Sequence, residues 1–281
     1  MRLLRFMKKT RVIYLIYKRL RTAFGVTLGF VLIYGSYTRN VTAAILPIAF
    51  GFWCIHLFGD CYNDYQDYEQ DLKNDRKDKW TVGGLMTREQ IRFFSFLVCF
   101  IGLLTFFFTN LFILLLGLFF SFTLFCYSNP KIHLKKYDFL GYFIVAIPLL
   151  LFPVTINTFF HRGFSTFDMF FTIFCFSHYV YLYCQKDSTD LKDETNLFLK
   201  RGWLNASIIC MIFASIASVS LFALSFPSII LIGVWIIHVS SKSLNIFKIY
   251  KNQISRNLRS KLILIEFLTP YLYAVGVLLG I

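Results

Sequence analysis

Apolar stretches of about 20 residues recur along this chain from Thr22 to its last residue, and short polar segments separate them. A helix of that length crosses the hydrocarbon core of a bilayer. Of the 281 residues, 57% are hydrophobic, a larger share than is usual in a soluble domain. Transmembrane strands alternate in polarity, whereas the Phe residues 106–108 and the Leu residues 114–116 form unbroken runs. The sequence therefore predicts an all-α integral membrane protein.

We predict nine transmembrane helices in a single bundle with a central cavity open to the cytoplasmic side. The predicted spans are residues 20–38, 41–62, 91–109, 111–128, 138–159, 167–185, 203–222, 224–241 and 260–280. The break before the eighth span is the weakest, because only Ser225, Phe226 and Pro227 interrupt the apolar run there. Residues 1–281 are expected to form one domain. Its basic segment 1–19 is expected to be retained and to lie at the membrane interface.

The positions of the basic residues account for the net charge of +14, which in a soluble protein would suggest nucleic acid. With nine spans, 27 of the 29 Lys and Arg residues fall on one face of the membrane, and only Arg39 and Arg162 fall on the other. Basic residues mark cytoplasmic loops. The pattern therefore predicts a multi-pass protein of the inner (cytoplasmic) membrane with a cytoplasmic N-terminus, and no nucleic-acid partner.

Acidic residues gather in two short segments at the cytoplasmic ends of the second and sixth predicted spans. Seven of the 15 lie between Asp60 and Asp78, and four lie between Asp187 and Glu194. A solvated acidic face is the ordinary explanation of such a run. Here it is disfavoured, because cytoplasmic helix ends usually carry Lys and Arg. Since both segments end helices on the same side of the membrane, we expect them to converge.

The first segment places four carboxylates on one face if the helix continues through it. Asp60, Asp64, Asp67 and Asp71 stand at offsets 0, 4, 7 and 11. Neighbours on such a face are about 5 to 6 Å apart, where two like charges repel by roughly 3 kcal/mol at an effective dielectric constant of 20. The spacing therefore predicts that a cation neutralises this face.

The second segment repeats the arrangement with Asp187, Asp190 and Glu194 at offsets 0, 3 and 7, while Asp193 is turned about 100° away from Glu194. Ligands that are all oxygen suit Mg²⁺ or Ca²⁺, and Mg²⁺ usually takes one or two carboxylates together with waters and substrate phosphates. Two carboxylate groups that face one another therefore predict metal ions bound around a diphosphate.

Three motifs, in this order, resemble those of the UbiA superfamily of intramembrane prenyltransferases. The first is NDxxDxxxD, here Asn63, Asp64, Asp67 and Asp71. The second is YxxxK with a basic continuation, here Tyr127, Lys131, Lys135 and Lys136. The third is KDxxDxxxD, here Lys186, Asp187, Asp190 and Glu194. The chain departs from the superfamily at Glu194, where Asp is usual. It also departs after the first motif, where residues 79–84 read KWTVGG in place of an Arg-Pro element.

The resemblance implies a magnesium-dependent prenyltransferase whose donor is a polyprenyl diphosphate. The implied metal ligands are Asp64, Asp67, Asp71, Asp187, Asp190 and Glu194. Asn63 adds an amide ligand or orients a phosphate-bound water, and Tyr127 and Lys131 donate to the diphosphate, with Lys135 and Lys186 as further candidates for binding it. The expected acceptor is a small aromatic compound of the quinone-precursor type, and Glu266 in the last span either assists that acceptor or is structural.

Two other functions fit parts of the same pattern. A UbiA-like terpene cyclase would use the same diphosphate site but no acceptor. A cation transporter would carry acidic residues along a path through the middle of the membrane, whereas the two clusters here lie at the ends of predicted spans. The transferase is therefore the favoured interpretation.

Overall fold

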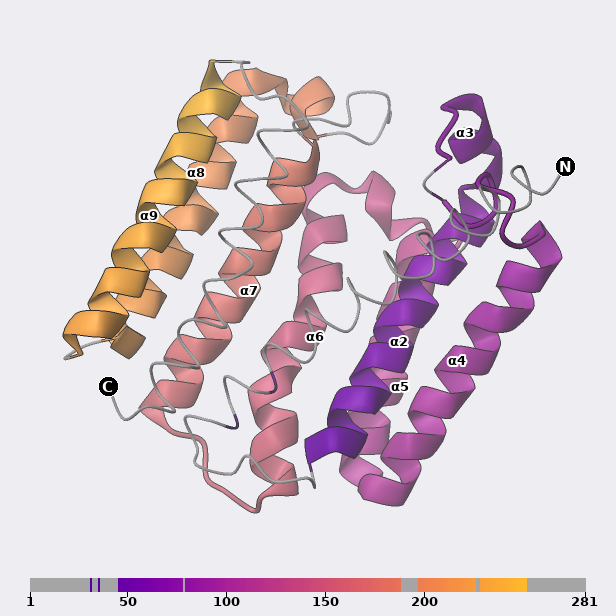
Figure 1. The fold of residues 1–281 in the computed structure, drawn as a ribbon, viewed down its shortest axis with the longest axis horizontal. Coiled ribbons are helices and arrows are strands. Elements are labelled where there is room, and N and C mark those ends of the chain that lie inside the picture. The colour runs from indigo at the N-terminus through magenta and orange to yellow at the C-terminus, as the bar shows by residue number, and fades with distance from the viewer. Residues whose placement is uncertain are drawn as a thin grey trace, which may run out of the picture. The chain divides into compact units, whose positions relative to one another are not determined.

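The computed structural model describes residues 31, 35, 45–77, 79–187, 197–225 and 228–251. Within these ranges the chain forms helices joined by short loops, and none of these residues belongs to a strand. The contacts between residues divide the chain into two compact units. The first contains helices α2 to α5, and the second contains η1 and α6 to α9 (Figure 1).

The first unit consists of α2 (Ile45–Gln66), α3 (Tyr68–Lys73), α4 (Arg88–Thr109) and α5 (Leu111–Ser128). α2 packs against both α4 and α5, which form an antiparallel pair (Figure 1). A capping box between Thr87 and Gln90 begins α4. The extended backbone of Asn110 ends α4, and the Asn110 side chain accepts a hydrogen bond from the backbone N–H of Phe112 (2.7 Å). One capping residue therefore separates the two long helices.

Three glycines let these helices approach closely. A Cβ atom on Gly51 or on Gly117 would overlap the ring of Phe106, which is fully buried. A Cβ atom on Gly102 would lie 2.9 Å from Cys54 Cβ and 3.0 Å from the backbone oxygen of Gly51. Small residues at helix interfaces are typical of membrane proteins, where close packing holds helices together.

We expect Gly102→Ala to lower the apparent Tm of the detergent-solubilised protein, because its new methyl group meets backbone that cannot move aside. Overpacking of this kind costs about 1 to 3 kcal/mol. Gly233→Ala in α9 is the matched control, since nothing lies within 4 Å of its added Cβ atom. In an open helical position alanine is favoured over glycine. Equal Tm values for the two variants would contradict the packing described here.

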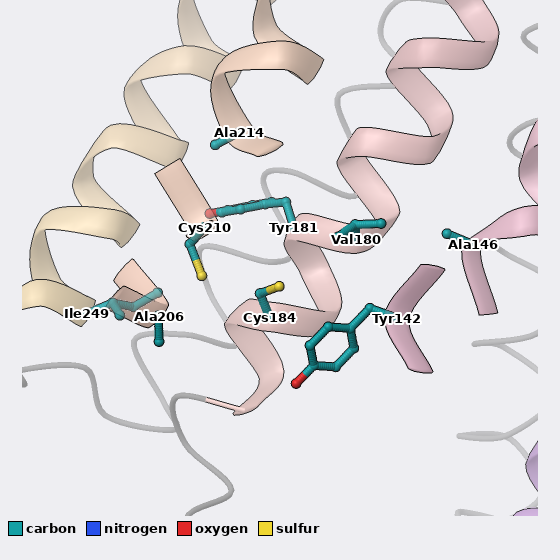
Figure 2. Close-up of a cluster of buried hydrophobic side chains, with 9 residues drawn as sticks. All are labelled: Tyr142, Ala146, Val180, Tyr181, Cys184, Ala206, Cys210, Ala214 and Ile249. Carbon is teal, nitrogen blue, oxygen red and sulfur yellow. The ribbon is translucent and has the colours of Figure 1, made fainter. Parts of the chain in front are cut away.

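The second unit consists of η1 (Leu134–Lys136), α6 (Asp138–Phe159), α7 (Thr166–Asp187), α8 (Leu197–Ser225) and α9 (Ile229–Tyr250). α7 packs between α6 and α8, and α8 packs against α9. Figure 2 shows the core where these four helices meet. The core residues are Tyr142, Ala146, Val180, Tyr181, Cys184, Ala206, Cys210, Ala214 and Ile249.

Five of the described helices are long and apolar enough to cross a membrane: α2, α4, α5, residues Gly202–Leu224 of α8, and α9. Large apolar side chains such as Phe93 (71% exposed) and Phe108 (78% exposed) lie on the outside. An exterior of this kind suits lipid and not water. The prediction of a helical membrane protein is confirmed. The total of nine spans, the single domain and the cytoplasmic cavity stay predictions.

The helix boundaries agree with most of the predicted spans. α5 and α6 cover 111–128 and 138–159 as predicted, and α4 and α7 extend their spans by at most three residues. A boundary near the predicted break is also present, because α8 ends at Ser225 and Ser228 caps the start of α9 at Ile229. Span 260–280 with Glu266, and almost all of 20–38, lie outside the described residues.

α9 differs from the predicted span 224–241 at both ends. α9 runs from Ile229 to Tyr250, so Lys242 is inside the helix and not in a cytoplasmic loop. Its side chain is only 1% exposed. Hydropathy misplaced this boundary because it treats a lysine as a loop residue, whereas polar neighbours on α7 accommodate this one within the helix packing.

Candidate functional site

The first acidic motif lies where α2 passes into α3. α2 ends at Gln66, and Asp67, with φ −87° and ψ 8°, separates it from α3. Hydrogen bonds from Asp67 N to Asn63 O (2.9 Å) and from Asp71 N to Asp67 O (2.8 Å) continue the helical pattern across this residue. The path through the motif is therefore nearly helical, with one distorted residue, so the condition on which the shared face depends is nearly met.

Lys79, from the loop after α3, lies against two carboxylates of this motif. Its Nζ atom is 2.7 Å from Asp64 Oδ1 and 3.7 Å from Asp71 Oδ2. The second oxygen of Asp64 accepts a hydrogen bond from the backbone N–H of Trp80 (3.4 Å). Asp64 is 1% exposed and Asp71 is 7% exposed. The structure thus brings Asp64 and Asp71 together around one cation, as their shared face predicts.

Asp71 is the least satisfied of these groups. Its Oδ2 atom is buried and has no hydrogen-bond partner. Burial raises the pKa of Asp71 above its ordinary value, the charge of Lys79 lowers it, and the charges of Asp64 and Asp67 raise it further. A buried carboxylate oxygen that has no hydrogen bond, only a 3.7 Å ion pair with Lys79, and lies near two other carboxylates is suited to a further cation.

The described residues fit Mg²⁺ only as part of a larger shell. Among them, no three acidic, His or Cys side chains converge closely enough to hold a metal ion. Mg²⁺ commonly takes one or two protein carboxylates and completes its shell with waters and substrate phosphates. The pair Asp64 and Asp71 meets that requirement.

In the sequence Lys79 stands out only as a departure from the superfamily pattern, and its contact with the carboxylates, which come from an earlier segment, is not evident there. We expect Lys79→Met to tighten Mn²⁺ binding about tenfold in the absence of donor, because a competing positive charge is removed. The measurement is a titration with Mn²⁺ followed by electron paramagnetic resonance. Lys77→Met is the matched control, since Lys77 pairs with exposed Asp75 (2.8 Å). Unchanged Mn²⁺ affinity in Lys79→Met would contradict this placement.

The end of α5 and the loop after it, which together carry the YxxxK motif, are attached to the end of α2. Ser128 Oγ donates to Asn63 Oδ1 (3.0 Å), and Asn129 Nδ2 donates to the hydroxyl of Tyr62 (3.3 Å). The ring of Tyr62 stacks on Phe125, with centroids 5.1 Å apart. These contacts join two motifs that are 60 or more residues apart in the chain.

The side chains of that second motif differ in burial. Tyr127 is half-buried, whereas Lys131 is exposed and its backbone N–H donates to Asn129 Oδ1 (2.9 Å). Lys135 is half-buried and lies in η1. An exposed, long cationic side chain on an anchored loop can reach an anionic group that arrives from water.

The second acidic motif begins at the last turn of α7. The backbone of Lys186 and Asp187 belongs to that helix. The side chains of these two residues, and all of Asp190, Asp193 and Glu194, lie outside the described residues. Convergence of the two acidic segments therefore stays a prediction.

Residues 22–243 match the sequence profile of the UbiA prenyltransferase family. No curated protein is similar enough in sequence to count as a match. Among solved structures, one of a digeranylgeranylglyceryl phosphate synthase is similar, with 16% identity, a TM-score of 0.66, and coverage of 97% of this chain and 99% of that one.

Two further similar structures are of a UbiA homologue from Archaeoglobus fulgidus. The one bound to GPP and Mg²⁺ has 16% identity and a TM-score of 0.65, and the match covers 93% of this chain and 98% of that one. The one bound to DMAPP and Mg²⁺ has 15% identity and a TM-score of 0.66, with coverage of 94% and 99%. At these identities the structures establish a shared fold over nearly the whole chain.

Proposed function

Because the chain belongs to the UbiA prenyltransferase family, we propose that it transfers a prenyl chain from a polyprenyl diphosphate to a small aromatic acceptor, with Mg²⁺. The observation that carries this proposal is the buried pair Asp64, near the end of α2, and Asp71 in α3, whose Oδ2 atom has no hydrogen bond. The homologue from Archaeoglobus fulgidus binds GPP or DMAPP together with Mg²⁺, which supports both the donor class and the metal.

The proposed Mg²⁺ ligands are Asp64, Asp67 and Asp71 from the first motif, together with Asp187, Asp190 and Glu194 from the second. Bound Mg²⁺ supplies positive charge that stabilises the diphosphate as a leaving group. Asn63, held by Ser128 through its Oδ1 atom, keeps its amide N–H groups for a phosphate oxygen or a water.

Further hydrogen-bond donors come from the end of α5 and from the loop after it. Tyr127 and Lys131 donate to diphosphate oxygens as the bond between the first prenyl carbon and oxygen breaks and its electron pair leaves with the diphosphate. Lys135 and Lys186 add positive charge there. The acceptor ring then forms the new carbon–carbon bond and loses a proton to the released diphosphate. The donor tail lies among apolar helices, within the bilayer.

We further propose that the protein lies in the inner (cytoplasmic) membrane with its N-terminus and site facing the cytoplasm. The support is the distribution of basic residues. Lys242 is inside α9 and no longer counts among the basic loop residues. The excess of Lys and Arg on the predicted cytoplasmic face remains without it.

The test is an assay of the purified full chain with Mg²⁺, geranyl or geranylgeranyl diphosphate, and a panel of hydroxylated aromatic acids, read by mass spectrometry. We expect diphosphate release and a prenylated product that require both Mg²⁺ and an acceptor. A cyclised hydrocarbon formed without acceptor would instead identify a terpene cyclase. Failure to bind either donor in the presence of Mg²⁺ would refute the proposal.

A further inference from the structure

α9 has an apolar outer face and a polar inner face. Ile236, Ile237, Leu244 and Phe247 are exposed on the outside of this apolar helix. The opposite face carries four buried polar side chains at spacings of three and four residues, which are His238, Ser241, Lys242 and Asn245. Polar groups within a membrane-spanning helix are expensive and usually mark a site of function.

Residues of α7 form the facing wall. Lys242 Nζ lies 3.0 Å from His178 Nδ1 and 4.1 Å from the centroid of the Tyr181 ring. Asn245 Nδ2 donates to the hydroxyl of Tyr181 (3.2 Å). The rings of His178 and His238 are 5.3 Å apart. Three of the four polar residues of α9 thus contact the polar residues of α7, and His178 and Tyr181 are both fully or almost fully buried.

His238 and Ser241 have buried polar atoms without a hydrogen-bond partner. His238 is 0% exposed, and neither Nδ1 nor Nε2 has a hydrogen-bond partner. Ser241, 7% exposed and three residues further along α9, has an unpartnered Oγ atom. Each unsatisfied buried group costs about 1 to 3 kcal/mol, and the bilayer core provides no water to satisfy it. A hydroxyl group brought in by a ligand would offset this cost.

The cluster lies close to the second acidic motif along α7. Tyr181 and His178 precede Asp187 by six and nine residues, which corresponds to about 9 to 14 Å along a helix axis. The proposed diphosphate site is at that end of α7. The reacting carbon of an acceptor must approach the first prenyl carbon to about 3 to 3.5 Å. A polar group on that acceptor would then lie deeper in the membrane than the diphosphate, toward the cluster.

We propose that His238 and Ser241 bind the hydroxyl group of a phenol or quinol acceptor. A neutral imidazole donates from one ring nitrogen and accepts at the other, and a serine hydroxyl does both. A phenolic hydroxyl offers the complementary donor and acceptor. The aromatic rings of Phe174 and His178, stacked with centroids 5.5 Å apart, border the site on α7. This inference rests on the proposed prenyl transfer and names the acceptor end of the same reaction.

The experiment uses hydroquinone as the probe and compares His238→Leu, Ser241→Ala and His238→Gln with the wild-type full chain. Hydroquinone is expected to raise the Tm of the wild-type protein without any donor present, and His238→Leu is expected to abolish that shift. In the transfer assay, KM for hydroquinone should rise about tenfold in His238→Leu and in Ser241→Ala, while KM for geranyl diphosphate stays unchanged. His238→Gln should recover part of the loss.

Ser240→Ala is the matched control, because Ser240 neighbours Ser241 but is exposed on the outer face of α9. An absent Tm shift in the wild-type protein would overturn the inference, as would wild-type KM values for hydroquinone in both His238→Leu and Ser241→Ala. A wild-type protein that binds no geranyl diphosphate with Mg²⁺ would instead refute the proposed transfer, since the hydroquinone shift is measured without donor.

Discussion

Asp64→Asn is expected to lower kcat/KM for the prenyl diphosphate by about 100- to 1000-fold, because it removes a negative charge from the centre of the proposed metal site. Asparagine keeps the size of the side chain and an oxygen that accepts from the backbone N–H of Trp80. The fold should therefore persist. Steady-state kinetics with varied Mg²⁺ measure the loss, and a Mn²⁺ titration without donor should show weakened binding.

Asp75→Asn is the control for this variant. Asp75 follows the same motif, but its side chain is 71% exposed and pairs with Lys77. A surface ion pair of this kind contributes little, so activity should stay within about twofold of wild type. If Asp64→Asn turned over normally with a normal Mg²⁺ requirement, the first motif would not be the metal site.

Asp187→Asn is expected to lower kcat by a similar factor, because the second acidic motif supplies the other three proposed Mg²⁺ ligands. Kinetic measurements at saturating Mg²⁺ would give the loss in kcat. The double variant with Asp64→Asn should lose less than the product of the two single losses, since residues that act as one unit are not additive. Full additivity would indicate two independent sites.

Glu194 and Asp193 offer a paired comparison within the second motif. The helical face shared with Asp187 favours Glu194 as the ligand. We therefore expect Glu194→Gln to lower kcat about 100-fold and Asp193→Asn to change it less than twofold. The opposite result would place Asp193 at the metal and would show that the chain departs from a regular helix there.

Hydropathy alone predicts a helical membrane protein. The fold that this chain shares with solved structures at 15 to 16% identity agrees with that prediction. Apolar length is a property of consecutive residues, so the boundaries of α5 and α6 follow from the sequence directly. The face shared by Asp64 and Asp71 likewise follows from helical spacing, and the structure places both against one lysine.

The sequence by itself determined a helical membrane protein and the residues of the acidic motifs, because helix length, charge placement and the 3.6-residue period are local properties. Only the tertiary structure decided that Lys79 reaches Asp64 from 15 positions away, that Ser128 holds Asn63, and that Lys242 is buried against His178. Each of these contacts depends on how separate segments pack. Hydropathy therefore assigned Lys242 to water, whereas polar groups on α7 allow it to lie inside the protein.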